Sequence, residues 1–212
     1  MAQSYNPEGV KFFFKTLVEP NLIIPHIQVK DINGLNPELL KEAGVKGVVF
    51  DKDNTLTEYH SNRLHPRIYD SLEKFRSAFE TKDLAILSNS AGTPDDPDLK
   101  EAKSLENHLG IPVIRHNKKK PAGGEETANH FGYEPQSILI VGDRILTDIA
   151  FGNRYGMITA LVKPLNWIRD NKMAMLCRPF ENVALWCLER PLYKYSAPKN
   201  TISEKYQELM KE

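Results

Sequence analysis

The stretch Val48-Val49-Phe50-Asp51-Lys52-Asp53-Asn54-Thr55-Leu56 decides the fold of this chain. Its apolar start, residues 48–50, predicts a buried parallel strand, and the strand ends in two carboxylates. In open α/β sheets, ligands bind at the carboxyl ends of the strands. Two carboxylates two residues apart at such an end can hold one divalent cation and leave an oxygen to attack phosphorus. The stretch therefore indicates phosphate-transfer chemistry, although Asp-x-Asp is also common in turns and helix caps.

Further apolar runs alternate with helical patterns along the chain. The runs are residues 84–90, 111–114, 138–141 and 157–162. The helical patterns lie between them, at about residues 66–80, 98–109, 122–131 and 146–155. Alternating strands and helices predict an α/β fold with a doubly wound parallel sheet.

Polar residues follow three of these runs. Ser88 and Asn89 lie near the end of the run 84–90. A lysine triplet with Pro121 follows the run 111–114. Gly142-Asp143 follows the run 138–141, with Asp148 five residues further on. Because the carboxyl ends of parallel strands share one edge of a sheet, we expect these residues to gather around Asp51 and Asp53.

The order Asp-x-Asp, Ser, Lys, Gly-Asp-x-x-x-Thr-Asp resembles the haloacid dehalogenase superfamily of phosphatases. Five strings narrow the resemblance to the mitochondrial phosphatidylglycerophosphate phosphatases, over about residues 10–170. These strings are residues 51–54, 88–92, 110–116, 119–121 and 141–149. The resemblance implies hydrolysis of phosphatidylglycerophosphate to phosphatidylglycerol, on the route to cardiolipin. It also implies a mitochondrial location, on the matrix face of the inner membrane.

The same resemblance assigns the carboxylates. Asp51 would be the nucleophile, and Asp53 would be the general acid and base. A second Asp at that position is associated with phosphatases in this superfamily, which favours hydrolysis over dehalogenation. Asp51, Asp143 and the main-chain carbonyl of Asp53 would hold Mg²⁺, which prefers oxygen ligands. Asp148 is better placed to orient the metal's waters or Lys120, or it caps a helix.

The remaining roles involve hydrogen-bond donors and cations. Ser88 and the amide of Asn89 would donate to phosphoryl oxygens. Lys120 would offset the charge of the nucleophile and the phosphoryl group, with Lys119 and Lys118 as alternatives. Gly142 would let the backbone pass close to the metal. Weaker candidates for substrate contacts are Arg144, Arg115, His116 and Lys119, each of which fits a peripheral position equally well.

The spacing of the motifs excludes a large cap domain. About thirty residues separate the first motif from the second, and a similar number separates the second from the third. One helix and its loops consume each span. We therefore expect a capless core with an open site, which suits a phosphate on a large substrate such as a lipid or a polymer end.

We divide the chain into an N-terminal apolar segment (1–35), the phosphatase core (36–165) and a C-terminal helical extension with a polar tail (166–212). The lysine-edged run 10–18, followed by 22–25, either contacts a membrane surface or packs on the core. Apolar positions at helical spacing in the tail predict a core or partner interface, including self-association into a homo-oligomer.

Bulk properties limit the partners. A net charge of +0 gives no global field that attracts nucleic acid. No apolar run approaches the roughly twenty residues of a transmembrane helix, so membrane contact is expected to be peripheral. Two alternatives stay open: a phosphatase acting on a soluble sugar phosphate or polynucleotide end, and an inactive scaffold of the same fold at a membrane surface. The presence of every catalytic residue type argues against the scaffold.

Overall fold

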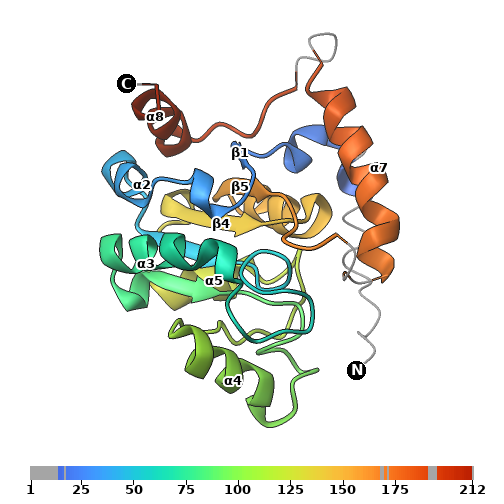
Figure 1. Ribbon diagram of the computed structural model, residues 1–212. Helices are drawn as coiled ribbons and strands as arrows, with labels where there is room; N and C mark the ends of the chain where they lie inside the picture. The colour runs from blue at the N-terminus through green and yellow to red at the C-terminus, as the bar shows by residue number, and fades with distance from the viewer. Residues whose placement is uncertain (1–13, 17, 168–169, 171, 191–194, 212) are drawn as a thin grey trace.

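The computed structural model describes residues 14–16, 18–167, 170, 172–190 and 195–211. Its centre is a five-stranded parallel sheet (Figure 1). Across the sheet the strands run in the order β1-β5-β4-β2-β3. Their bounds are Ile27–Val29 (β1), Gly47–Phe50 (β2), Leu84–Ile86 (β3), Ile138–Gly142 (β4) and Ile158–Val162 (β5). Every paired register is parallel. The predicted parallel α/β sheet is confirmed.

Helices connect the strands and extend past them. The α-helices are α2 (Pro37–Ala43), α3 (Tyr69–Ala78), α4 (Lys100–Leu109), α5 (Gly124–Phe131), α6 (Ala150–Arg154), α7 (Lys172–Leu188) and α8 (Thr201–Leu209). Short 3₁₀ turns are η1 (Pro20–Ile23), η2 (Ile32–Gly34), η3 (Pro66–Ile68), η4 (Thr81–Asp83), η5 (Pro97–Leu99) and η6 (Pro135–Ser137), and Ile145–Ile149 forms a π turn, η7. Between β2 and β4, a stretch described throughout, these helices and loops leave no separate cap, as predicted.

The apolar run 111–114 does not form a full strand. Val113 makes a single bridge with Ile86. The Pro112 carbonyl accepts from the Ile86 amide at 2.8 Å, and the Ile114 amide donates to the Ile86 carbonyl at 2.8 Å. Because proline has no amide hydrogen, it cannot extend this ladder.

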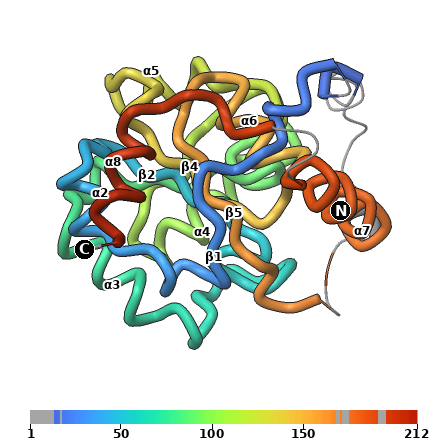
Figure 2. Tube along the Cα trace, turned by 90° about the horizontal axis from the view of Figure 1, so that it is seen from above, coloured from blue at the N-terminus to red at the C-terminus, as the bar shows by residue number. Residues whose placement is uncertain are grey.

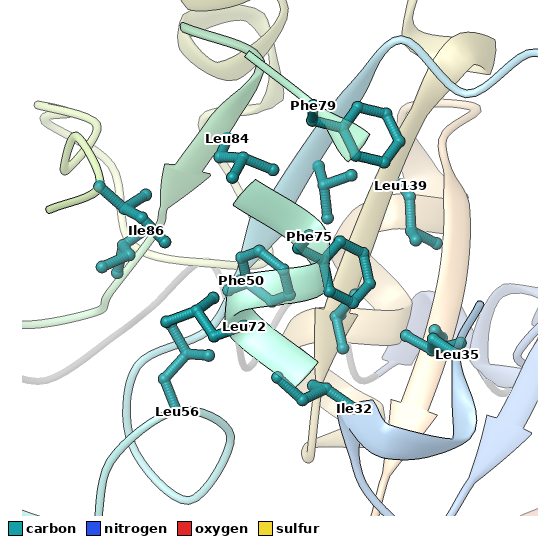
Figure 3. Packing of buried hydrophobic residues seen from close by; sticks show 14 of the residues in the cluster. Ile32, Leu35, Phe50, Leu56, Leu72, Phe75, Phe79, Leu84, Ile86 and Leu139 are labelled. Atoms are coloured by element: carbon teal, nitrogen blue, oxygen red, sulfur yellow. The ribbon is translucent and has the colours of Figure 1, made fainter. Parts of the chain in front are cut away.

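Alternating side chains of the strands cover the two faces of the sheet. Val48 and Phe50 point into the larger core, whereas Val49 points into the opposite one. In the larger core, the rings of Phe50 and Phe75 from α3 pack in a T shape, with ring centroids 5.2 Å apart (Figure 3). Phe151 of α6 packs in the opposite core. Apolar cover on both faces holds the sheet rigid, so the strand ends are fixed relative to one another.

The segment before α2 packs on the sheet. β1 is its edge strand and lies beside β5. Leu22, Ile23 and Ile24 are buried against Ile145 and Leu185. Residues 20–29 therefore pack on the core, which is the second of the two roles predicted for the N-terminal segment. Residues 1–13 lie outside the described part of the chain.

The two C-terminal helices lie at opposite sides of the molecule (Figure 2). α8 packs beside α2, where the Asn36 amide donates to the Tyr206 hydroxyl at 3.1 Å. α7 turns Leu185 inward but exposes Leu176, Phe180 and Val183. Among the described helices, none combines the length and the apolar character required to cross a membrane.

Candidate active site

The polar motifs meet at the carboxyl edge of the sheet, as the parallel topology requires. Asp51 follows β2, and its amide donates to the Val141 carbonyl of β4 at 2.8 Å, which joins the first and fourth motifs. A small hollow of about 70 Å³ opens at this edge. Its lining residues are Asp51, Asp53, Tyr59, Asn89, Lys120, Asp143, Arg144, Thr147, Asp170 and Arg178.

Lys120 bridges two carboxylates at the floor of the hollow. Its Nζ donates to Asp51 Oδ1 at 2.6 Å and to Asp148 Oδ1 at 2.5 Å. Burial alone would lower the pKa of Lys120, but the two carboxylates raise it above its ordinary value, so the ammonium stays charged. Burial, together with Asp148 and Asp53, raises the pKa of Asp51 to about 7 despite the opposing effect of Lys120.

One oxygen of Asp51 is available for chemistry. Oδ1 accepts from Lys120, whereas Oδ2 has no hydrogen-bond partner among the described residues. A carboxylate held by one oxygen and open at the other is positioned to act as a nucleophile. The sequence left three lysines open for the cation; the structure brings Lys120 into the hollow, whereas Lys119 pairs with Asp95 at 2.5 Å and Lys118 is exposed.

Asp53 is held by a lysine that the sequence analysis did not single out. Lys52 is buried, and its Nζ donates to Asp53 Oδ1 at 3.1 Å and to Glu101 Oε1 at 3.0 Å. Burial lowers the pKa of Lys52, but Asp53 and Glu101 more than offset that effect and raise it. Since Asp53 also accepts the His60 amide at 3.3 Å, its carboxylate is oriented from two sides. Glu101 lies on α4, 49 residues after Lys52, so no local sequence pattern predicts this contact.

The second and third motifs are joined by side chains that bind the main chain of the other loop. Ser88 is buried, and its Oγ accepts the Ser90 amide at 3.2 Å. The Asn89 side-chain oxygen accepts a hydrogen bond from the Lys120 main-chain amide at 2.8 Å, and this bond positions the main chain of Lys120. The buried His116 ring contacts the carbonyls of Ser88 and Lys118 at 2.8 and 2.7 Å. His116 therefore braces the two loops and does not line the hollow.

Asp143 is held by an arginine of α7. Arg178 donates to the Asp143 carbonyl at 2.8 Å and also pairs with its carboxylate, and Arg178 Nε donates to Asp170 at 2.7 Å. Burial raises the pKa of Asp143 well above its ordinary value, with Asp51 and Asp148 adding to the rise and Arg178 opposing it.

A second ion pair joins α7 to the same loop. Arg144 lines the hollow and donates to Glu181 Oε1 at 3.2 Å. Neither Arg178 nor Glu181 belongs to any of the sequence motifs that predicted the site. Their spacing with Leu185 on one face of a helix marks an inward-facing side, but nothing local links that side to Asp143.

Three carboxylates form an acidic cluster that fits a hard cation. Asp51, Asp143 and Asp148 each offer an oxygen, and these oxygens lie within 4.8 Å of one another. Oxygen ligands of this kind suit Mg²⁺. The cluster adds the Asp148 carboxylate to those of Asp51 and Asp143, and the main-chain carbonyl of Asp53 stays a predicted ligand. A Cβ on Gly142 would lie 2.4 Å from Asp148 Cβ, so this glycine makes room for the Asp148 carboxylate.

The weaker candidates for substrate contacts separate into two groups. Arg144 lines the hollow. Arg115 instead pairs with Glu106 of α4 at 2.5 Å, and Lys119 pairs with Asp95 in the loop before α4. Both therefore hold neighbouring elements together outside the hollow.

The chain matches the family described as mitochondrial PGP phosphatase over residues 8–166. It is 41% identical over 201 residues to Phosphatidylglycerophosphate phosphatase 1, chloroplastic/mitochondrial, of Arabidopsis thaliana, which covers 93% of this chain and 57% of that protein. It is 43% identical over 189 residues to Phosphatidylglycerophosphate phosphatase 1, chloroplastic, of Chlamydomonas reinhardtii, covering 87% and 70%.

A yeast relative, Phosphatidylglycerophosphatase GEP4, mitochondrial, of Saccharomyces cerevisiae, is 35% identical over 170 residues, covering 78% of this chain and 88% of that protein. The chain thus spans 57% of the length of the Arabidopsis relative and more of the other two. The family match includes every motif at the carboxyl edge of the sheet, from Asp51 to Asp148. This chain belongs to the mitochondrial PGP phosphatase family.

Proposed function

We propose that this protein hydrolyses phosphatidylglycerophosphate to phosphatidylglycerol and phosphate through an aspartyl-phosphate intermediate, with Mg²⁺ as cofactor. One observation carries the proposal: Asp51 is held by Lys120 through Oδ1 and leaves Oδ2 without a partner among the described residues, at the edge of a cluster of three carboxylates. The proposed nucleophile, Asp51, and the cation that would balance its charge, Lys120, therefore lie side by side at the carboxyl edge of the sheet.

In the first step, Asp51 Oδ2 attacks the phosphorus of the terminal phosphomonoester. The bond between phosphorus and the glycerol oxygen breaks, and Asp53 gives a proton to that oxygen. Lys120, charged and buried between Asp51 and Asp148, offsets the negative charge that gathers on the phosphoryl group.

In the second step, Asp53 takes a proton from water, and the resulting hydroxide attacks the phosphorus of phospho-Asp51. Cleavage of the acyl phosphate releases inorganic phosphate and restores the carboxylate. Asp51, Asp143 and the main-chain carbonyl of Asp53 would hold the cation, with the Asp148 carboxylate beside them. The cation would supply Lewis-acid stabilisation of the phosphoryl oxygens.

A lipid substrate at a membrane surface is supported by two features. Within the described part of the chain no separate cap is inserted between β2 and β4, so a phosphate on a bilayer can reach the site. Beside the site, α7 presents Leu176, Phe180 and Val183 outward, with Phe180 73% exposed. A helix that exposes an apolar stripe can insert it at the bilayer interface. The mitochondrial names of the Arabidopsis and yeast relatives support that organelle, and we propose the matrix face of its inner membrane.

The decisive experiment measures phosphate release from phosphatidylglycerophosphate in mixed micelles, with Mg²⁺ or with a chelator. Glycerol 3-phosphate and a 3′-phosphorylated oligonucleotide serve as competing substrates. Fast Mg²⁺-dependent release from the lipid alone supports the proposal. Preference for a soluble phosphate would retain the aspartyl-phosphate chemistry and reject the lipid, and absence of release from all three would favour a scaffold.

Membrane contact has a separate test, by flotation with anionic vesicles. Replacing Leu176, Phe180 and Val183 by serine should abolish flotation and leave hydrolysis of soluble phosphates unchanged. Flotation of the triple variant at the level of the unmodified protein would contradict this part of the proposal.

A further inference from the structure

A groove of about 610 Å³ adjoins the hollow and runs along the inner side of α7. Asp143 and Arg178 line both spaces, so the groove begins where the hollow ends. Its opposite wall is formed at the ends of β5 and β1, the strands that lie beyond β4 in the sheet. The groove therefore occupies the same carboxyl edge as the catalytic residues.

Two lysines stand at those strand ends. Lys30 follows β1 and Lys163 follows β5, and both line the groove. The Lys163 amide donates to the Lys30 carbonyl at 3.1 Å, so their main chains lie side by side. Both side chains are exposed, and within the described part of the chain neither ammonium has an ion-pair partner.

The acidic residues of the groove are already engaged. Asp143 pairs with Arg178, and Glu181 pairs with Arg144 and accepts the Ile145 amide at 3.3 Å. Glu189 accepts from the Gln28 side chain. Gln28 is neutral and leaves the Glu189 charge in place, but among the described residues Glu189 forms no ion pair with either lysine. The two lysines are therefore unpaired cations in a groove that continues from the proposed phosphate site. Such a pair attracts a second anion.

The distance from the nucleophile suits a two-phosphate substrate. Neighbouring strands lie about 4.8 Å apart, so the end of β5, two strands from β2, is on the order of 10 Å from Asp51. The flexible four-carbon stem of Lys163 can bring its ammonium closer. Around it, Leu161, Trp167 and Trp186 offer apolar surface to the lining.

We propose that this groove binds the phosphodiester and glycerol of a phospholipid substrate, with Lys30 and Lys163 pairing with the phosphodiester while the terminal phosphate lies at Asp51. The proposal rests on the proposed function, since it names the part of that substrate which the groove recognises. It makes the two lysines specificity-determining residues that do not take part in bond breaking.

The test compares two soluble substrates that share a terminal phosphomonoester. Glycerol 3-phosphate lacks the phosphodiester, whereas deacylated phosphatidylglycerophosphate carries it without acyl chains. The Lys30→Ala/Lys163→Ala variant should lose about ten- to thirtyfold in kcat/KM on the diester substrate, mainly through KM. Its kcat/KM on glycerol 3-phosphate should stay within about twofold of the unmodified protein.

A matched control removes the same charge elsewhere. Lys74 on α3 and Lys82 in η4 are both exposed and lie outside the lining of the groove. Lys74→Ala/Lys82→Ala should retain the preference for the diester substrate. An equal loss on both substrates in the groove variant, or no loss on either, overturns the proposal.

A binding measurement separates this proposal from the proposed function. Glycerophosphoglycerol, which has the phosphodiester and no phosphomonoester, should bind the unmodified protein and bind the groove variant at least about tenfold more weakly by calorimetry. Equal binding to the two proteins, or binding to neither, overturns the groove whatever the hydrolysis assay gives. Absence of hydrolysis with binding that depends on the two lysines would reject the proposed function and retain the groove.

Discussion

Arg178 holds Asp143 through both its main chain and its side chain: one guanidinium nitrogen donates to the Asp143 carbonyl at 2.8 Å, and another pairs with the carboxylate. A single residue of α7 therefore fixes the end of β4. The same contact places a protein cation on a carboxylate of the acidic cluster, where a metal ion would also bind.

Replacing Arg178 by methionine should strengthen metal binding, because no ion pair then has to be broken. We expect Mg²⁺ affinity, measured by calorimetry at pH 8 without substrate, to rise about tenfold, or about 1.4 kcal/mol. Arg190→Met, which removes an arginine beyond the end of α7, serves as the control. Weaker binding to the Arg178 variant would show that the arginine positions Asp143 for the metal and does not compete with it.

Replacing Asp51 by asparagine should abolish turnover and preserve the fold. The change removes the proposed nucleophile, so kcat should fall by at least about 10³-fold. Stability should be kept, because the raised pKa of about 7 shows that burying this carboxylate charge is costly and Lys120 retains Asp148. Phosphate release and thermal unfolding of the same preparation check both parts. Residual turnover within tenfold of the unmodified protein would refute Asp51 as the nucleophile.

Replacing Lys120 by methionine should cost both activity and stability. Two buried carboxylates would lose their shared cation, a loss of about 3–5 kcal/mol for an uncompensated buried charge. Adding Asp148→Asn should recover part of the stability and none of the activity. Urea unfolding and phosphate release measure the two effects.

Lys119→Met is the matched control for that experiment, since Lys119 is the next residue and pairs with the less buried Asp95. Its loss should cost no more than about 1 kcal/mol and leave the phosphoryl-transfer step working. Equal losses of stability and activity in the Lys119 and Lys120 variants would contradict the role assigned to Lys120.

His26 should make the fold less stable in mild acid. Its Nδ1 accepts the Thr159 amide at 3.2 Å, and its Nε2 faces the Pro198 carbonyl at 2.8 Å, an arrangement that fits the neutral ring. Burial lowers the pKa of His26, with the Pro198 carbonyl opposing the effect. The unfolded chain therefore takes up a proton first, so this stability is complete above about pH 6.5 and is lost as pH falls through the folded pKa.

Thermal unfolding between pH 8 and pH 5 tests this dependence. His26→Gln should flatten the curve by up to about 1.4 kcal/mol per pH unit in the window below pH 6.5. His108→Gln, a change at an exposed ring, should leave the slope as it is in the unmodified protein. An unchanged slope in the His26 variant would assign the acid sensitivity to other groups.

Local patterns predicted most of the catalytic edge. Two short apolar runs form the strands that end at Phe50 and Gly142. In each case the polar residue comes directly after the strand in the sequence. Parallel pairing then brings Asp51 and Asp143 together without further information. The tail was harder to interpret, because helical spacing does not say which apolar side chains find a partner: Leu185 is buried, whereas Phe180 is exposed.

The sequence by itself determined the parallel sheet, the place of Asp51 at the end of a buried strand and the order of the motifs, because each depends on residues within a few positions of one another. Tertiary structure alone decided which lysine enters the hollow, that Lys52 and Glu101 orient Asp53, and that Arg178 reaches Asp143. These contacts join residues far apart in the chain. Arg178 and Asp143 are 35 positions apart, Lys52 and Glu101 are 49 apart, and Lys120 and Asp51 are 69 apart. A buried charge takes the partner that the packed elements bring to it, and only the packing of α4 and α7 against the sheet fixes that choice.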